Sequence, residues 1–266
     1  MEEQNENGAP KKGDRIAKVM ARAGLCSRRD AERWIEAGRV KVNGKKLTTP
    51  ACVITGDDEV EVDGSIIGNK KEPTKIWLYH KPRGKITSHK DPQGRPTVFD
   101  SLPARMGRLI SLGRLDYNTE GLLILTNDGE FSRYATLPKT GWKRKYRVRV
   151  IGTVTQKQLD SMAKGVAVKD PKTGKMIRYG KVQARFTREE EAKGKNIWLE
   201  MIITEGKYRE IRRICEHFGL TVSRLIRTEY GPFQLGNLPM GELHEITGKA
   251  LQIKLASWLE HDQEGK

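Results

Sequence analysis

A short apolar run that ends abruptly is the feature that most constrains the fold of this 266-residue chain. The run extends from Leu122 to Thr126, and the next three residues, Asn-Asp-Gly, are a turn signal. Because the run has the length of a strand rather than of a helix, we predict a buried central strand here. A polar loop bounded by Gly113 and Gly121 precedes the strand and holds Asp116 at the edge of the core.

Asp116 is the candidate reactive group. An aspartate in a loop more often hydrogen-bonds its own backbone in a turn, and the spacing alone favours that interpretation. The surrounding pattern, however, reads Gly-Arg-Leu-Asp-x-x-Thr-x-Gly-Leu-Leu from Gly113, followed by Leu-Thr-Asn-Asp-Gly from Leu125. This long pattern resembles the signature of the RsuA-type pseudouridine synthases, and the resemblance extends from about Asp14 to about Ile246.

The resemblance implies an activity and a catalytic residue. In this family the aspartate of the Gly-Arg-Leu-Asp segment is catalytic, and it corresponds to Asp116. The implied reaction isomerises a uridine in RNA: the C1′–N1 bond breaks, the base turns, and C1′ rejoins at C5. The finer details resemble members that act on large-subunit 23S ribosomal RNA, with small-subunit 16S rRNA as the alternative. Whether the carboxylate attacks C1′, adds to the pyrimidine ring or removes the C2′ proton stays open.

Tyr146 lies in a strictly alternating segment, residues 143–150. It shares one face with Val148 and Val150, which is the ordinary pattern of a core aromatic. The segment resembles the second motif of the family, and this resemblance implies that the tyrosine ring packs against the target base. Stacking of that kind contributes about 1–3 kcal/mol.

The segment 205–213 resembles the third motif of the family, in which an arginine pairs with the catalytic aspartate. That arginine corresponds to Arg212. Where related synthases often carry glutamine, this chain has Glu210, whose own role is left open. For Arg209 and Arg213 a solvated or phosphate-facing side chain is the preferred interpretation.

The charge balance points to a polyanionic partner. Fifty Lys and Arg against 34 Asp and Glu give a net charge of +16, spread over most of the chain. The longest apolar runs are strand-sized, far below the roughly 20 residues that a membrane span requires. We therefore expect ribosomal RNA or a pre-ribosomal subunit as the partner, no membrane association, and a monomer.

The N-terminal region has two short helical patterns. Ser27 and Asp30 resemble a capping box that opens the second helix, and Gly24 and Gly38 stand where the two helices would end. Asp14 is the expected cap of the first helix. This order, with the segments 25–29 and 40–44, resembles an S4 RNA-binding domain.

Two arginines at the start of the second helix support that resemblance. Arg28 and Arg29 oppose the positive end of the helix dipole unless an anion binds there. A solvated surface is the alternative explanation of these charges. The expected RNA-binding residues are Arg15, Lys18, Arg22, Arg28, Arg29, Arg33 and Lys41 in this region, and Lys81, Arg83, Arg114 and Arg213 further along.

The expected fold is α+β: a small N-terminal S4-like RNA-binding domain followed by a larger pseudouridine synthase domain with a mainly antiparallel sheet. Residues 1–13 are expected to form a disordered tail, 14–72 the S4-like domain and linker, 73–260 the catalytic domain, and 261–266 a polar tail.

The sequence gives no sign of a cofactor or metal. Three widely spaced cysteines and five histidines make neither a disulfide framework nor a zinc motif, and no phosphate-binding glycine loop is present. We expect no cofactor and no metal site. The acidic, polar start of the chain does not resemble a secretory signal, which predicts a cytoplasmic protein.

Two other functions compete with the synthase. One is a non-catalytic RNA-binding ribosome assembly factor, in which the second domain is only a scaffold. The other is a glycosidase-like hydrolase with paired carboxylates, Asp116 with Asp91 or Asp128, because that chemistry also breaks a bond to C1′.

Overall fold

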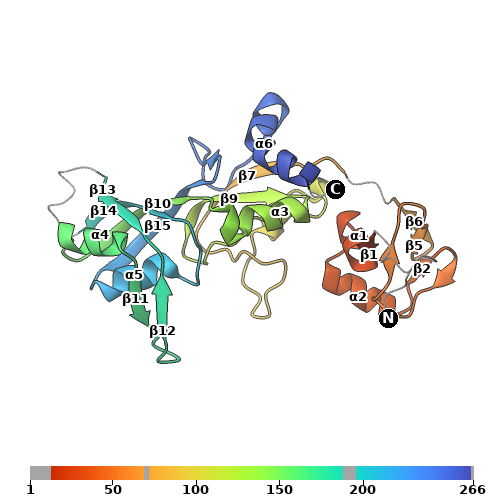
Figure 1. Ribbon diagram of the computed structural model, residues 1–266, viewed down its shortest axis with the longest axis horizontal. Coiled ribbons are helices and arrows are strands. Elements are labelled where there is room, and N and C mark those ends of the chain that lie inside the picture. The colour runs from red at the N-terminus through yellow and green to blue at the C-terminus, as the bar shows by residue number, and fades with distance from the viewer. Residues whose placement is uncertain (1–12, 69–71, 188–195, 265–266) are drawn as a thin grey trace. The chain divides into compact units, whose positions relative to one another are not determined.

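The computed structural model describes residues 13–68, 72–187 and 196–264. The described chain divides into two compact units, and the division falls after Thr74 (Figure 1). Two short segments, 104–109 and 127–129, group with the first unit. Apart from Gly13, the predicted N-terminal tail lies outside the described residues.

The N-terminal unit consists of a helix pair and short antiparallel strands. Its elements are β1 (Asp14–Arg15), α1 (Ile16–Arg22), α2 (Arg28–Glu36), β2 (Val40–Val42), β3 (Lys45–Lys46), β4 (Val53–Ile54), β5 (Val60–Val62) and β6 (Ser65–Ile67). Strand β1 pairs with β4, and the remaining strands pair in the order β3-β2-β5-β6. Ile16 and Met20 of α1 pack with Ala31 and Ile35 of α2 in its core.

Local signals set the helix ends in this unit. The predicted capping box opens α2: the Asp30 amide donates to the Ser27 hydroxyl at 3.0 Å, and the Ser27 amide donates to the Asp30 carboxylate at 3.4 Å. Gly24 and Gly38 follow the two helices in the left-handed conformation, with φ of +77° and +71°. Asp14 is not a helix cap: it lies in β1, and its carboxylate accepts hydrogen bonds from Lys18 and Arg22.

The larger unit is built on one extended sheet. Its elements are β7 (Ile76–Lys81), β8 (Ile110–Ser111), β9 (Glu120–Thr126), α3 (Gly129–Thr136), β10 (Arg144–Ile151), α4 (Gln156–Ala163), β11 (Val166–Lys169), β12 (Met176–Tyr179), β13 (Gln183–Phe186), β14 (Asn196–Ile203), α5 (Glu210–His217), β15 (Thr221–Tyr230), β16 (Phe233–Gln234), β17 (Leu243–Ile246) and α6 (Gly248–Glu264). Three 3₁₀ turns, 99–101, 104–106 and 138–140, complete the described elements.

The sheet runs in the order β13-β14-β10-β15-β9-β7-β17. Within the described residues its pairings are antiparallel except for β15 and β9, which run parallel and pair only at Ile226–Glu120 and Arg227–Gly121. Strands β11 and β12 form a separate hairpin. The predicted α+β class with a mainly antiparallel sheet is therefore confirmed.

Strand β9 is the predicted central strand, and it is buried along its whole length. It pairs with β7 on one side and β15 on the other. Phe131 of α3 and Trp258 of α6 belong to the same buried core cluster as Leu122 and Ile124 of this strand. Helices α4 and α5 lie by the part of the sheet that contains β10 and β14 (Figure 1).

Two helices differ from the sequence prediction, α3 and α6. Helix α3, directly after the Asn-Asp-Gly turn, was not predicted. Helix α5 begins at Glu210, directly after Arg209, which has a left-handed backbone with φ of +52°. Helix α6 extends to Glu264, into the segment expected to be a polar tail.

Candidate active site

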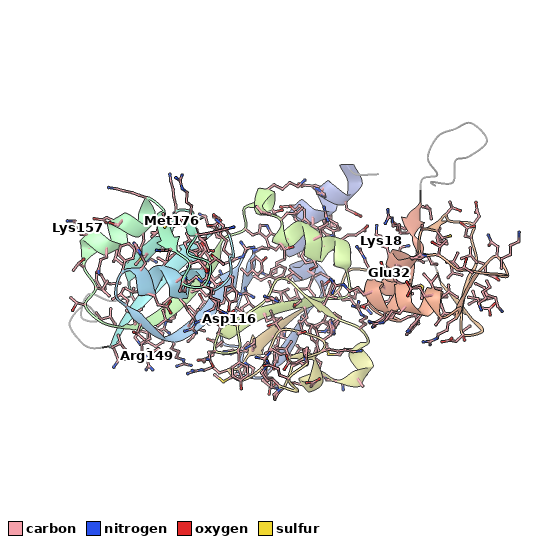
Figure 2. The ribbon with its side chains drawn as sticks, turned by 90° about the horizontal axis from the view of Figure 1, so that it is seen from below. Lys18, Glu32, Asp116, Arg149, Lys157 and Met176 are labelled. Carbon is pink, nitrogen blue, oxygen red and sulfur yellow. The ribbon has the colours of Figure 1, made fainter. Side chains whose placement is uncertain are left out.

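A cavity of about 410 Å³ opens in the larger unit where β10, β15 and the start of α5 meet the loop before β9. Figure 2 shows Asp116 in the middle of this unit, away from the end that carries Lys157 and Met176. The charged lining residues are Arg114, Asp116, Arg144, Glu205, Lys207, Arg209, Glu210, Arg212 and Arg227. Cations outnumber carboxylates here, so the cavity suits an anionic ligand.

The backbone on either side of Asp116 is held tightly. The Thr119 amide donates to the Asp116 carbonyl at 3.0 Å. Before it, the Leu115 carbonyl accepts a hydrogen bond from the Thr87 hydroxyl at 2.9 Å, and the Leu115 amide donates back to that hydroxyl at 3.2 Å. The Asp116 side chain itself is one-third exposed. A fixed backbone thus presents a carboxylate that solvent and substrate can reach.

Lys81, at the end of β7, also holds this loop in place. Its side chain is fully buried, and Nζ donates to the carbonyls of Pro82 at 2.9 Å, Asp116 at 3.2 Å and Thr119 at 2.9 Å. Burial lowers the pKa of Lys81 to about 8, and the charges of Asp116 and Glu120 oppose that shift. The structure does not support the predicted RNA contact of Lys81, because its ammonium is enclosed and bonded to backbone carbonyls.

Arg209 makes the ion pair with Asp116. Its Nη1 lies 3.8 Å from Oδ2 of Asp116. The left-handed backbone of Arg209 ends the preceding turn and allows α5 to begin at the next residue, Glu210. The sequence predicted a solvated or phosphate-facing side chain for Arg209; only the backbone conformation, which no local pattern signals, brings it to the carboxylate.

Arg212 lies beside this pair but binds backbone. Its Nη2 donates to the Asn118 carbonyl at 2.9 Å, and its Nη1 donates to the Val222 carbonyl at 3.1 Å. Burial, then the charge of Arg209, lowers the pKa of Arg212, and the charge of Asp116 acts in the opposite direction. Arg212 therefore ties the Asp116 loop to β15, while the ion pair expected of it is made by Arg209.

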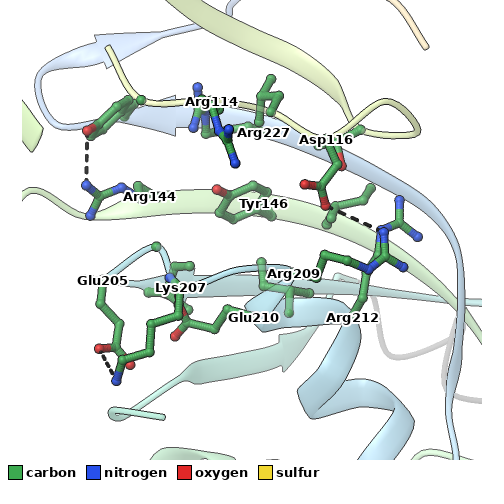
Figure 3. Close-up of a pocket in the computed structure, with 18 of the residues that line it drawn as sticks. Arg114, Asp116, Arg144, Tyr146, Glu205, Lys207, Arg209, Glu210, Arg212 and Arg227 are labelled. Atoms are coloured by element: carbon green, nitrogen blue, oxygen red, sulfur yellow. Dashed lines mark hydrogen bonds and ion pairs between the residues drawn. The ribbon is translucent and has the colours of Figure 1, made fainter. Parts of the chain in front are cut away.

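Tyr146 lies between the two sides of the cavity. Figure 3 shows Arg114, Arg227 and Asp116 along one side of its ring and Glu205, Lys207 and Glu210 along the other. The residue is 7% exposed and occupies β10, as the alternation predicted. Its ring is both part of the core and a wall of the cavity, so the two interpretations of the sequence do not exclude each other.

Glu210, the residue whose role was left open, is a buried carboxyl group in this cavity. It is 3% exposed; Oε2 accepts the Lys207 amide at 2.9 Å, whereas Oε1 has no hydrogen-bond partner among the described residues. Burial raises the pKa of Glu210 to about 7, and the charge of Glu205 adds to the shift. Lys207 pairs with Glu205 at 2.7 Å.

The other residues expected to bind RNA in this unit fall into two groups. Arg83 and Arg114 are exposed, and Arg114 lines the cavity. Arg213 is instead held by Asp170 at 2.9 Å, with its side chain 15% exposed. Its charge is neutralised within the protein, so the structure does not support an RNA contact for Arg213.

In the N-terminal unit, several of the expected cations also have carboxylate partners. Lys18 and Arg22 share Asp14, each at 2.6 Å; Arg33 pairs with Asp30, and Lys41 pairs with Glu61 at 2.8 Å. Arg15, Arg28 and Arg29 are exposed, and within the described ranges no ion pair is found for these three. Of the expected RNA-binding cations in this unit, these three are best placed to meet an anion.

The carboxylate pair of a glycosidase is not assembled here. Neither Asp91 nor Asp128 lines the cavity; Asp91 is held by Arg95 at 2.8 Å, and Asp128 accepts the Thr74 hydroxyl at 2.6 Å. In the part of the chain that the structure describes, no group of three or more His, Cys, Asp or Glu side chains is arranged for a metal ion. The described helices are each too short or too polar to span a membrane.

Comparison with known families assigns both units. Residues 75–217 match the RNA pseudouridylate synthase family, and residues 14–60 match the S4 domain. The matched ranges agree with the predicted fold class, an S4-like domain followed by a synthase domain.

Individual relatives extend over most of the chain. An uncharacterized RNA pseudouridine synthase of Rickettsia prowazekii is 40% identical over 244 residues, covering 91% of this chain and 97% of the relative. Ribosomal large subunit pseudouridine synthase B of Salmonella typhi is 41% identical over 240 residues, covering 88% and 79%. A crystal structure of a pseudouridylate synthase superposes with a TM-score of 0.61 at 25% identity, covering 88% of this chain and 96% of that chain.

Proposed function

The chain belongs to the RNA pseudouridine synthase family, and on that premise we propose that it isomerises a uridine of large-subunit ribosomal RNA with Asp116 as the catalytic carboxylate. The observation that carries this proposal is the position of Asp116: its backbone is held by hydrogen bonds, its carboxylate is accessible, and it shares a cavity with Tyr146 and five arginines.

The cavity has the size of a small-ligand site, since such pockets enclose roughly 300–1,000 Å³. A uridine in structured RNA must leave its base stack to enter, at a cost of a few kcal/mol. In our proposal the ring of Tyr146 stacks on the extruded base and offsets part of that cost. The exposed Arg83 and Arg114 receive the phosphates on either side.

The charges around Asp116 fit its proposed role. A carboxylate acts as a nucleophile or base only in its ionised form, and Arg209 supplies a positive charge 3.8 Å from it. Arg212 and Lys81 keep the loop in place through carbonyl groups and leave the carboxylate oxygens available. The first chemical step, at C1′, at the ring or at the C2′ proton, is compatible with this arrangement in each case.

Large-subunit RNA is proposed as the substrate because a relative that is 41% identical is named for the large ribosomal subunit. In the N-terminal unit Arg28 and Arg29 present exposed positive charge at the first turn of α2, where backbone N–H groups also favour an anion. This unit would hold the RNA backbone while the larger unit acts on the base. We further propose a cytoplasmic, monomeric enzyme that needs no cofactor.

The test is tritium release from RNA labelled at uridine C5. Purified protein is incubated with large-subunit rRNA, small-subunit rRNA and assembled subunits, beside the variant Asp116→Asn. Release from large-subunit RNA or from its subunit, lost in the variant, supports the proposal. Asn keeps the shape of Asp116, so RNA affinity serves as the control and is expected to stay within about twofold.

Three outcomes would overturn parts of the proposal. Release by Asp116→Asn at the wild-type rate would exclude Asp116 as the catalytic group. Release only from small-subunit RNA would replace the substrate. Tight RNA binding with no release from any of these substrates would favour the assembly-factor alternative.

A further inference from the structure

Arg227 enters the cavity from β15, on the same face of the sheet as Tyr146. The two residues are partners across the β10–β15 pair, and paired residues of adjacent strands point to the same face. The pairing shifts between Lys145 and Tyr146, so that Arg227 and Thr228 together face one position of β10. Bulges of this kind re-aim side chains, and they are frequent beside active sites.

Gly121 of β9 allows β15 to approach β9 closely at Arg227. It is the partner of Arg227 on the other side, in β9, with φ of +101°. A Cβ atom at Gly121 would lie 2.7 Å from the backbone nitrogen of Arg227, and closer still to its carbonyl oxygen. Gly121, the fifth residue after Asp116, thus serves the packing of β15, which carries Arg227 to the cavity.

The Arg227 guanidinium is buried with unused hydrogen-bonding capacity. The residue is 2% exposed, Nε donates to the Leu122 carbonyl at 2.8 Å, and Cζ lies 4.9 Å from the centroid of the Tyr230 ring. Nη2 is enclosed without a partner, and among the described residues no carboxylate lies within ion-pair distance of this side chain. A buried charge left in this state is costly, and such a group is expected to have a ligand.

We propose that Arg227 contacts the base of the target uridine directly, donating from its terminal nitrogens to a carbonyl oxygen of the uracil. The inference rests on the proposed function and adds a substrate contact that neither the composition nor the three motifs indicated. A base rather than a phosphate is the partner, because Arg227 lies inside the cavity beside the Tyr146 ring, whereas phosphates remain in solvent (Figure 3).

The chemistry of the reaction gives this contact a role. When the C1′–N1 bond breaks, its electron pair stays on the base, and the negative charge spreads over N1 and the carbonyl oxygens. The C1′–C5 bond then forms, C5 loses its proton, and N1 gains one, so that atoms and electrons balance without an oxidant. An arginine stays protonated at any pH where proteins are folded, so Arg227 stabilises the detached base electrostatically.

Because uracil is nearly symmetric, one hydrogen-bond donor can contact a carbonyl oxygen of the base both before and after the base turns. A half-turn about the N3–C6 axis exchanges N1 with C5 and O2 with O4. A donor that faces one carbonyl before the turn therefore faces the other carbonyl afterwards. Arg227, fixed at Nε by Leu122, does not have to move while the base turns.

The first experiment compares Arg227→Met and Arg227→Lys with wild type in single-turnover tritium release. The Met variant is expected to react about 100-fold more slowly, as when an oxyanion donor is removed, and the Lys variant to recover part of the rate through its charge. RNA affinity and its salt dependence are expected to stay unchanged. The matched control is Arg147→Met, which removes an exposed arginine from β10, over the Trp198 ring, and leaves the cavity intact.

The outcomes separate this inference from the proposed function. Absence of release by wild type would defeat the proposed function itself. Release by wild type with a Met variant within twofold of it would defeat the inference alone. Weaker RNA binding and a smaller salt slope at an unchanged rate would show a phosphate contact, and would also overturn it.

The second experiment changes the substrate, and its effect on wild type does not depend on how a variant folds. Once wild type has identified its target uridine, RNA is prepared with sulfur in place of O2 or O4 at that uridine. Because sulfur is a poorer hydrogen-bond acceptor, we expect slower turnover by wild type and a clearly smaller effect on Arg227→Lys. Thio substitutions without effect on wild type, or with equal effects on both proteins, would overturn the inference.

Discussion

Nη1 of Arg209 lies 3.8 Å from Oδ2 of Asp116, and Arg209 holds this position in a left-handed backbone conformation with φ of +52°. A non-glycine residue pays conformational energy there, of about 1–2 kcal/mol. The third motif predicted this ion pair for the neighbouring Arg212, but Arg212 donates its hydrogen bonds to two backbone carbonyls. Strain is thus retained at the position where a charge meets the carboxylate.

This relationship predicts opposite effects on stability and rate. Arg209→Gly relieves the backbone and removes the ion pair, so the thermal midpoint should stay at or above that of wild type while tritium release slows about 10-fold or more. Arg209→Ala should slow tritium release by the same factor, and its free energy of unfolding should be about 1 kcal/mol lower than that of the Gly variant. Equal stability of the two variants would show that the backbone at residue 209 relaxes.

Lys81→Met should slow the reaction more than it destabilises the fold. The variant leaves the carbonyls of Asp116 and Thr119 without their donor, but it also removes a buried charge, so the two effects on stability oppose each other. A looser Asp116 loop should cost about 10- to 100-fold in single-turnover rate, with unchanged RNA affinity. Loss of affinity at a normal rate would instead restore the RNA-binding role predicted from the sequence.

Glu210→Gln should remove a pH dependence of stability. The pKa of Glu210 is raised from 4.5 to about 7, so between these values the unfolded chain releases its proton first, and the free energy of unfolding falls as pH rises. The free energy of unfolding of the Gln variant, relative to that of wild type, should therefore increase by on the order of 1–3 kcal/mol from pH 5 to pH 8. Chemical denaturation at both pH values measures this.

Activity of that variant provides the second half of the test. Because the resemblance to the family implies that glutamine is common at this position, Glu210→Gln should isomerise uridine within a few-fold of wild type at pH 8. Glu216→Gln, on the exposed side of α5, is the control and should show no change in its pH dependence. A constant difference in stability between Glu210→Gln and wild type across pH would contradict the raised pKa.

Gly121→Ala should be among the most damaging single-methyl changes in the larger unit. Its added Cβ would meet the backbone of Arg227, which cannot rotate away, and we expect a loss of about 3 kcal/mol or more in urea unfolding. Gly236 also has a positive φ, of +54°, but faces open space. The control Gly236→Ala should cost only about 1–2 kcal/mol, and equal costs would refute the close approach.

The double variant Arg28→Ala/Arg29→Ala should weaken binding of rRNA at each salt concentration and lower the salt slope by about 2. Lys41→Ala, whose cation is already paired with Glu61, should change the slope less. Titrations at several ionic strengths measure both. A larger effect of Lys41 would mean that its ion pair opens on binding.

The sequence by itself determined the elements whose signals lie within a few residues. The apolar run before Asn-Asp-Gly specified β9, the Ser27–Asp30 capping box opened α2, and the glycines at 24 and 38 ended helices. The long motif around Asp116 indicated the family, and the resemblance to the family implied that Asp116 is the catalytic carboxylate. Each of these depends on local backbone geometry or on a pattern that a single segment contains.

The tertiary structure decided where the long cationic side chains go. An arginine or lysine can reach solvent, a carboxylate or a carbonyl from one backbone position, and the choice depends on which strands pair and how closely. Lys81 donates hydrogen bonds to the Asp116 loop because β7 ends next to that loop. Arg209 lies near the carboxylate because its backbone is left-handed. Arg227 reached the cavity through a bulge opposite Gly121, a non-local pairing that no motif encodes.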